Sequence, residues 1–227
     1  MEFSLTSKQT LPQPHYQHLL TVMVLRLLII PFLQGGLGEI VASLLFFYIT
    51  FLIVQSYRLK RSLFVIFVAI AAVGFFLDII LTLGWVSTSV TPMILTFLSI
   101  YIVFFGSAAL LILQNIVKTP RVTMDMVRGG ICVYLLLGYF WALLYAMVYT
   151  LDGNAFSSAL LTDDSYLNLL YFSFVTLTTL GFGDIVPVNE VASVFTILEA
   201  LVGQMYPTVF IALLVGGYLA NRQIPDE

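Results

Sequence analysis

The sequence predicts an all-α membrane protein with six spanning helices and a shorter helix and loop between the fifth and the sixth. Two observations indicate this class. Of the 227 residues, 60% are hydrophobic and only 9% are charged, far from the composition of soluble domains. The apolar residues also gather in runs of about 20, the length that an α-helix needs to cross a bilayer. We therefore expect a multi-pass protein of the cell membrane.

The first four predicted spans form an outer membrane domain, residues 16–118, which follows an N-terminal segment at residues 1–15. Hydropathy and length place these spans at 16–33, 39–57, 62–83 and 93–117. Glycines make the first turn, and a basic cluster at 58–61 ends the second span. The third and fourth spans are joined by an uncharged bend.

A second unit, residues 129–220, follows a polar linker at 119–128. It contains the fifth and sixth predicted spans, at 129–151 and 191–220, and a tail at 221–227 follows it. Between these spans, residues 166–178 form an uncharged run that is too short to cross a bilayer. Asp163, Asp164 and Ser165 precede the run and are good helix N-caps. We expect a re-entrant helix, which enters and leaves the membrane on one side.

The most distinctive local sequence follows this short helix. Thr178, Thr179 and Leu180 precede Gly181-Phe182-Gly183, and Asp184 comes next. Glycine permits backbone dihedrals that other residues resist. Non-helical backbone at membrane depth persists only where it is buried in protein or lines a water-filled path. The motif therefore favours a path through the membrane over an ordinary turn.

The run from Thr179 through Gly183 resembles the Thr-Val-Gly-Tyr-Gly pore loop of potassium channels, in which carbonyl rings replace the hydration shell of K⁺. The resemblance implies a selectivity filter formed by five residues: Thr179, Leu180, Gly181, Phe182 and Gly183. The carbonyls of the first four would bind K⁺, and Thr178 and Asp184 would flank the filter. Phe182 stands where many members have a tyrosine whose hydroxyl ties the filter to the helix behind it.

The same resemblance implies an assembly of four chains. One filter strand cannot surround an ion, whereas four strands related by rotation can. The expected partners are three further copies of the chain, in a homotetramer, and the lipid bilayer. We expect no nucleic acid partner, no cofactor other than K⁺ in the filter, and no soluble ligand-binding domain, because only residues 221–227 follow the last span.

The distribution of charge predicts the orientation in the membrane. Eight of the nine basic residues fall on one side of the predicted spans, whereas acidic residues surround the loop on the other side. These basic residues are Lys8, Arg58, Lys60, Arg61, Lys118, Arg121, Arg128 and Arg222. Because basic loops stay in the cytoplasm, we expect both termini there and the filter near the outer face.

The outer domain lacks the charges of a voltage sensor. Residues 93–117 contain no Lys or Arg, and each charge that crosses the field contributes only about 2.3 kcal/mol per 100 mV. We therefore expect no strong voltage gating. Arg26 and Asp78 are the charges deepest in this domain. They either pair with each other or find separate polar partners.

Two residues of the last span bear on gating, and a third lies near the filter. Pro207 cannot donate a hydrogen bond to the carbonyl of Gly203, so the two mark a weak point in the helix. They form either a gating hinge or a static kink that widens the cavity. Glu199, one turn before Gly203, is expected to accept hydrogen bonds near the short helix or to be protonated, and its role is either structural or in tuning the filter.

Passive, selective conduction of K⁺ is the leading functional interpretation. Two alternatives stay open: a weakly selective monovalent cation channel, and a non-conducting receptor or scaffold that retains a pore-like sequence. A transporter is disfavoured because only one half of the chain has a re-entrant signal. We do not expect an enzyme, since the sequence has no nucleophile–base arrangement, metal-ligand cluster or phosphate-binding loop.

Overall fold

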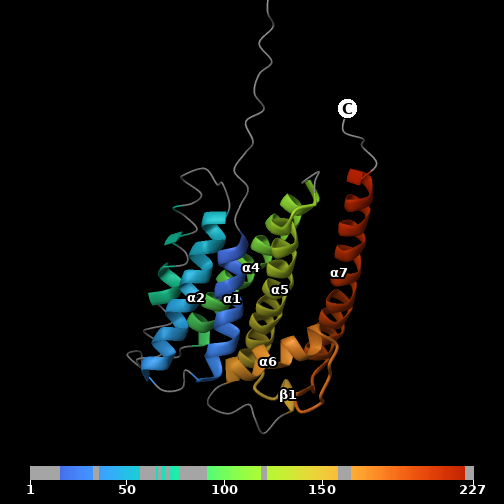
Figure 1. Cartoon of the computed structure of the whole chain (residues 1–227). Coiled ribbons are helices and arrows are strands. Elements are labelled where there is room, and N and C mark those ends of the chain that lie inside the picture. Colours follow the sequence, from blue (N-terminus) through green and yellow to red (C-terminus); the bar gives the residue numbers. More distant parts are fainter. Residues whose placement is uncertain are drawn as a thin grey trace, which may run out of the picture.

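The structure is a computed structural model, and it describes residues 16–32, 36–56, 65, 68–69, 72–76, 91–118, 122–157 and 165–222. Helices dominate these residues (Figure 1). In chain order the elements are α1 (Tyr16–Ile29), η1 (Ile30–Phe32), α2 (Gly36–Ser56), α4 (Thr91–Lys118), α5 (Met124–Leu151), β1 (Phe156–Ser157), α6 (Ser165–Leu177), β2 (Val186–Pro187) and α7 (Glu190–Arg222). Most of the predicted third span lies outside the described residues.

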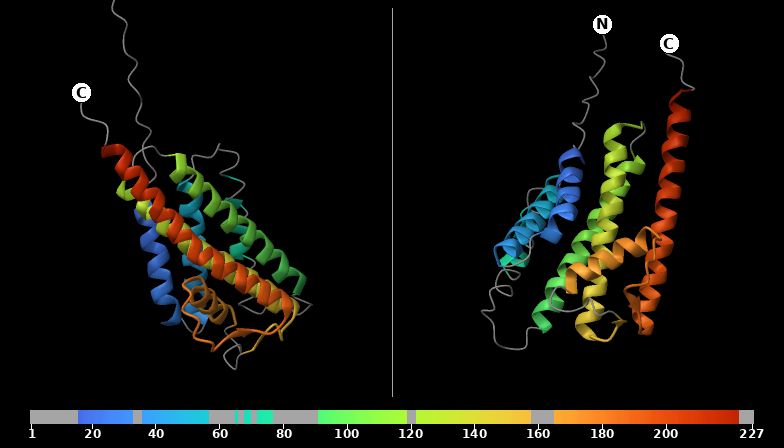
Figure 2. Two further views of the ribbon diagram at one scale, coloured as in Figure 1. Left: turned by 90° about the vertical axis from the view of Figure 1, so that its right-hand side faces the viewer. Right: turned by 60° about the horizontal axis from the view of Figure 1, so that its bottom comes forward.

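The helices form one group around α5, with α1, α2 and α4 on one side and α7 on the other (Figures 1 and 2). α6 crosses from the α1 side toward α7 near one end of the molecule. The start of α1 and the end of α7 both lie at the opposite end, on different sides of α5 (Figure 1). The first described helix therefore begins, and the last one ends, at the end of the molecule remote from α6.

The prediction of a mostly helical membrane protein is confirmed. Three helices in the described part of the chain are long and apolar enough to cross a membrane: α4, α5 and the Glu190–Leu219 part of α7. α1, the Ser43–Gln55 part of α2 and the Tyr166–Leu177 part of α6 are shorter apolar helices. Six complete spans and a re-entrant course for α6 remain predictions.

α5 begins at Met124, earlier than the predicted start at residue 129. Thr123 has an extended backbone and caps the helix, since its side chain accepts a hydrogen bond of 3.2 Å from the backbone N–H of Met126. Asp125 lies in the first turn, where the helix dipole favours an acid. It also accepts a hydrogen bond of 3.0 Å from the backbone N–H of Tyr16. Residues 124–128, predicted as part of the linker, are thus helix, and the carboxylate of Asp125 lies at the N-termini of both α5 and α1.

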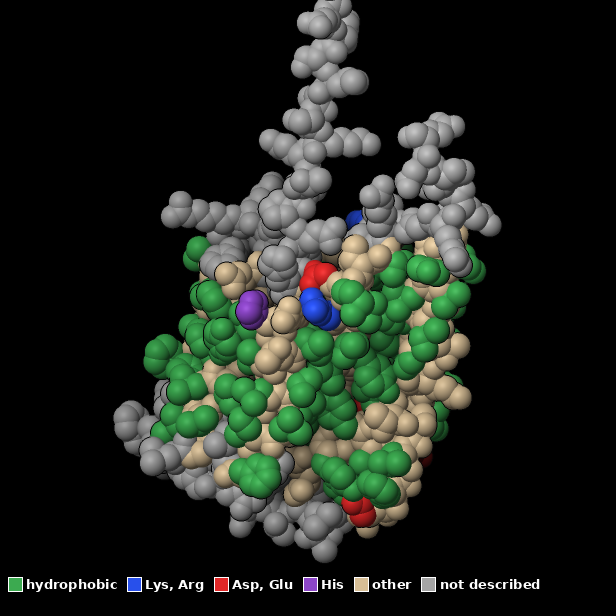
Figure 3. Space-filling model, in the orientation of Figure 1, with side chains coloured by type: hydrophobic (Ala, Val, Ile, Leu, Met, Phe, Trp, Pro, Cys, Tyr) green, Lys and Arg blue, Asp and Glu red, His purple; other side chains and the backbone are tan. Residues whose placement is uncertain are grey.

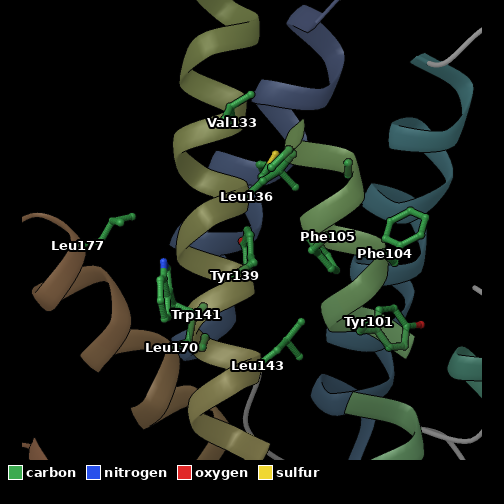
Figure 4. Packing of buried hydrophobic residues seen from close by; sticks show 14 of the residues in the cluster. Tyr101, Phe104, Phe105, Val133, Leu136, Tyr139, Trp141, Leu143, Leu170 and Leu177 are labelled. Carbon is green, nitrogen blue, oxygen red and sulfur yellow. The ribbon is translucent and has the colours of Figure 1, made fainter. Parts of the chain in front are cut away.

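An aromatic core holds the outer helices against α5 (Figure 4). Phe105 of α4 is fully buried, and its ring centroid lies 5.9 Å from that of Tyr139 on α5 and 5.2 Å from that of Phe46 on α2. Such ring pairs stabilise a core beyond the area that they bury. Only residues 119–123 connect α4 to α5, so α4 turns back at once and packs along α5 of its own chain.

Arg26 is a charged residue inside this core. Its side chain is only 4% exposed. The guanidinium carbon lies 4.7 Å from the ring centroid of Phe46 and 5.0 Å from that of Tyr139. A desolvated cation over an aromatic face gains about 2 kcal/mol, so the two rings offset part of the cost of burying the charge. Asp78 lies outside the described residues, and its pairing with Arg26 stays a prediction.

The described part of the face shown in Figure 3 is hydrophobic over most of its height. Figure 3 shows hydrophobic side chains across the middle of the visible face, with charged side chains near its two ends. α7 in particular exposes large apolar side chains along its length, from Val191 to Leu219. A helix with so much exposed apolar surface is suited to contact lipid or other protein chains.

Candidate functional site

The short helix α6 is fixed between α5 and α7. It ends at Leu177, one residue before the end predicted from the sequence. The hydroxyl of Tyr134 on α5 donates a hydrogen bond of 3.0 Å to the carbonyl oxygen of Leu177. On the same side, Phe174 packs against Gly138 so closely that an added Cβ at Gly138 would lie 2.5 Å from its ring. The end of α6 is therefore held by direct contacts.

The loop that follows α6 has an unusual backbone. The φ angle is positive at Thr179 (59°), Gly181 (59°) and Gly183 (80°), and the residues between them have negative φ. Among the described residues, Thr179 is the only non-glycine residue with a positive φ. A β-branched residue in this region is a genuine outlier that costs about 1–3 kcal/mol. Such strain is concentrated at functional sites in proteins.

The N–H groups of this loop fold back onto α6. The backbone N–H of Thr179 donates to the carbonyl of Thr176 at 2.9 Å, and those of Leu180 and Gly181 donate to the carbonyl of Val175 at 2.9 and 3.3 Å. These bonds satisfy carbonyls that the helix end would leave unpaired. No described residue donates to a carbonyl oxygen of residues 179–183. The N–H groups of residues 179–181 are therefore bonded to α6, whereas the carbonyl oxygens of residues 179–183 accept no hydrogen bond from a described residue.

A side-chain contact fixes the outer end of the loop. The hydroxyl of Tyr171 on α6 donates a hydrogen bond of 2.7 Å to Oδ2 of Asp184. The backbone N–H of Ile185 donates to Oδ1 at 3.1 Å. Phe182 has no hydroxyl and is 64% exposed in the single chain. The side-chain connection from the loop to α6 is therefore made by Tyr171, which the sequence did not single out, and it adds to the backbone bonds of residues 179–181.

The segments around the loop are joined by a second group of contacts. Asp152, just after α5, accepts hydrogen bonds from the side-chain amide of Asn189 at 2.8 Å and from the backbone N–H of Asn154 at 3.0 Å. These bonds, the one from Asn189 foremost, lower the pKa of the Asp152 carboxyl from its ordinary value. β1 and β2 pair as a short antiparallel ribbon, with Phe156 opposite Pro187. The end of α5 is thereby attached to the start of α7.

Gly203 has a packing role that the sequence did not predict. A Cβ built on Gly203 would lie 2.0 Å from the carbonyl oxygen of Leu177. The absence of a side chain therefore lets α7 approach the end of α6. Pro207 lies one turn further along, and the helix is continuous through it. Whether these two residues form a hinge stays a prediction. The close approach of α7 to α6 already explains why position 203 is a glycine.

Glu199 of α7 is completely buried behind α6. Its carboxyl oxygens contact the hydroxyl of Tyr145 on α5 at 2.5 Å and that of Ser173 on α6 at 2.6 Å. The expectation of hydrogen bonds near the short helix is thus confirmed. Tyr145 and Ser173 lie far from Glu199 in sequence, and no motif marked either of them.

Comparison with known proteins identifies the same region. Residues 129–216 match a family model described as "Ion channel". The matches support a relationship of this segment to the potassium channel superfamily. The voltage-gated delayed rectifier potassium channel KCNH5 from Homo sapiens is 41% identical over 49 residues, and the proteins from Mus musculus and Rattus norvegicus match equally. The match covers 21% of this chain and 5% of each relative. No solved structure matches the chain.

The matched segment, residues 129–216, holds all of the site residues predicted from the sequence. Residues 178–184 lie together as an exposed loop at the end of α6. Gly203 and Pro207 lie apart from the loop, on α7, and Gly203 contacts the base of α6. The resemblance inferred from the loop sequence is confirmed at the level of the superfamily.

Proposed function

We propose that four copies of the chain form a potassium-selective channel that conducts K⁺ passively. In this channel the backbone carbonyls of Thr179, Leu180, Gly181 and Phe182 coordinate the ion. The proposal rests on one observation above all, the exposed loop in which φ alternates in sign and the N–H groups of residues 179–181 are bonded to α6. A ring of such carbonyls replaces the water around K⁺.

The alternation of φ supports this role for a geometric reason. Consecutive residues of opposite handedness make their N–H groups converge on one side of the chain. In this loop the N–H groups converge on the end of α6. The carbonyls are left for the opposite side, where three further strands would complete the ring. The C-terminal end of α6, which carries the negative end of the helix dipole, lies at the base of the loop.

Features of the fold support the proposed topology. The start of α1 and the end of α7 lie at the same end of the molecule (Figure 1), in keeping with both termini in the cytoplasm. We propose a re-entrant α6 within a pore domain at residues 129–220, and an outer domain at residues 16–118 that flanks the tetramer. The exposed apolar surface of α7 supplies contacts for the other copies and for lipid.

The outer domain is not proposed as a voltage sensor. α4 has one basic residue, Lys118, and it is the last residue of the helix. Each charge that moves through the membrane field gains about 2.3 kcal/mol per 100 mV. Arg26 is enclosed by aromatic rings. The described helices therefore carry too little movable charge for steep voltage dependence.

A weakly selective cation channel is the second candidate. The observation in its favour is the exposed Phe182, which has no hydroxyl with which to hold the filter. In that case Na⁺ would also pass through the ring of carbonyls.

Reversal potentials of the purified protein in planar bilayers test the function. Under opposed K⁺ and Na⁺ gradients, we expect the reversal potential to lie close to the equilibrium potential of K⁺. A value near zero would favour the weakly selective channel. The absence of current, in a preparation that elutes as a stable oligomer, would favour a non-conducting receptor or scaffold.

Replacing Tyr171 with phenylalanine is expected to reduce selectivity while conduction persists. The change removes the hydroxyl that binds Asp184 and nothing else. We expect the K⁺/Na⁺ permeability ratio to fall by roughly fivefold, the effect of one ordinary hydrogen bond. Tyr218→Phe is the matched control, because Tyr218 is an exposed tyrosine of α7. An unchanged ratio in Tyr171→Phe would show that this contact does not hold the filter.

A further inference from the structure

The buried carboxyl of Glu199 joins the three helices of the pore domain. Its side chain has no exposed surface. Oε2 lies 2.5 Å from the hydroxyl of Tyr145 on α5, and Oε1 lies 2.6 Å from the hydroxyl of Ser173 on α6. The Ser173 hydroxyl lies in turn 2.8 Å from the carbonyl oxygen of Gly138 on α5. These groups form a chain of three short oxygen–oxygen contacts.

The number of hydrogens in this chain determines its charge. Each of the three contacts needs one hydrogen, and a hydroxyl carries only one. Tyr145 and Ser173 supply two, and the carbonyl of Gly138 supplies none. The third hydrogen is available only on the carboxyl of Glu199. With it, Tyr145 donates to Glu199, Glu199 donates to Ser173, and Ser173 donates to Gly138, so that every contact is a hydrogen bond.

The surroundings of Glu199 also favour a neutral carboxyl. The titratable groups that face it are Tyr145 and Tyr134, both on α5. α6 contributes Ser173, and no described basic side chain pairs with Glu199. A buried carboxylate without a cation loses its hydration and gains little in return. The ring of Tyr145 is held by Phe172 and Phe156, at centroid distances of 5.0 and 5.5 Å.

We propose that Glu199 carries a proton in the conducting channel, and that the neutral carboxyl is a positioning residue for the filter. The inference rests on the proposed function. Ser173 belongs to α6, whose C-terminal end carries the loop at residues 178–184. Loss of the proton leaves two hydrogens for three contacts, and the oxygens of Ser173 and Gly138 then repel each other. α6 moves away from α5, the filter carbonyls lose their register, and conduction falls as the pH rises.

Potassium flux into liposomes, measured against pH, tests this role. For the wild type we expect flux to fall about tenfold per pH unit above the midpoint, as for a single ionisable group. Glu199→Gln keeps all three contacts without a titratable proton, because its amide oxygen accepts from Tyr145 and its NH₂ donates to Ser173. We expect this variant to conduct with a flat pH profile. The control, Glu190→Gln, changes an exposed glutamate of the same helix and should keep the wild-type profile.

Infrared spectroscopy tests the protonation without relying on flux. At neutral pH we expect a carboxylic-acid C=O band in the wild type and in Glu190→Gln. The band should be missing from Glu199→Gln, and it should disappear from the wild type at alkaline pH. Absence of the band from the wild type at neutral pH, or a Glu199→Gln variant that keeps the wild-type pH profile, overturns the inference. If no variant conducts at any pH, the proposed function fails, and only the infrared band tests the protonation of Glu199. A band in the wild type at neutral pH then supports the protonation, and its absence overturns it.

Discussion

Replacing Gly203 with alanine is expected to remove most of the K⁺ flux. The new methyl group would lie 2.0 Å from the carbonyl oxygen of Leu177, and a backbone atom at the end of α6 cannot turn aside as a flexible side chain can. Overpacking of this kind costs about 1–3 kcal/mol, which exceeds the gain of about 1 kcal/mol for alanine in a helix. We expect flux per assembled protein to fall at least about tenfold, in liposomes matched for their content of the proposed tetramer.

Two further variants separate packing from hinge motion. A Cβ at Gly216 would meet no atom within 4 Å, so Gly216→Ala should leave flux close to that of the wild type. Pro207→Ala restores a backbone donor one turn further along α7. If Gly203 acts through packing, Gly203→Ala is far more damaging than Pro207→Ala. Equal changes of open probability in the two variants, with unchanged conductance, would instead indicate a hinge.

Replacing Gly181 with alanine is expected to abolish selectivity between K⁺ and Na⁺. Apart from its chain neighbours Leu180 and Phe182, no described atom lies within 4 Å of the position of the new Cβ, so the effect comes from the backbone. At a φ of 59°, a side chain costs about 1–2 kcal/mol, and the four copies in the proposed tetramer would each bear it. The loop would relax toward negative φ and turn its carbonyl away. We expect the permeability ratio to fall to near one in reversal-potential measurements.

Gly153 provides the matched control for this substitution. It lies in the exposed turn after α5, its φ is not in the left-handed region, and a Cβ there would meet nothing within 4 Å. Gly153→Ala should therefore retain the wild-type permeability ratio. A Gly181→Ala channel that also retains it would contradict the assignment of residues 179–182 as the ion-coordinating backbone.

The position of the candidate site was predictable because it depends on local sequence. An uncharged run after polar capping residues predicted a helix at 166–178, and α6 occupies Ser165–Leu177. The spacing of Gly181 and Gly183 identified the loop in the same way, since glycine favours backbone of positive φ. No feature of the sequence predicted the positive φ of Thr179. A β-branched residue adopts it only because the surrounding contacts impose it.

The connections around the site were not predictable because they join residues distant in sequence. Glu199 is separated by 54 residues from Tyr145 and by 26 from Ser173, and no spacing rule links them. Gly203 drew attention through Pro207 nearby on its own helix, whereas its contact is with α6. The start of α5 was not predicted because Asp125 is a charged residue typical of a linker. Its carboxylate in fact accepts a hydrogen bond from the backbone N–H of Tyr16 at the start of α1.

The brief connection at residues 119–123 has a consequence for how channels of mixed composition would arise. Because α4 returns along α5 of the same chain, the described outer helices of a newly synthesised subunit pack without help from a neighbour. Closure of the proposed tetramer then requires no exchange of these helices, only lateral diffusion of finished subunits within the bilayer. Wild-type and variant chains expressed together should accordingly co-assemble in proportion to their abundance, and a tetramer would give five classes of ring with zero to four altered copies.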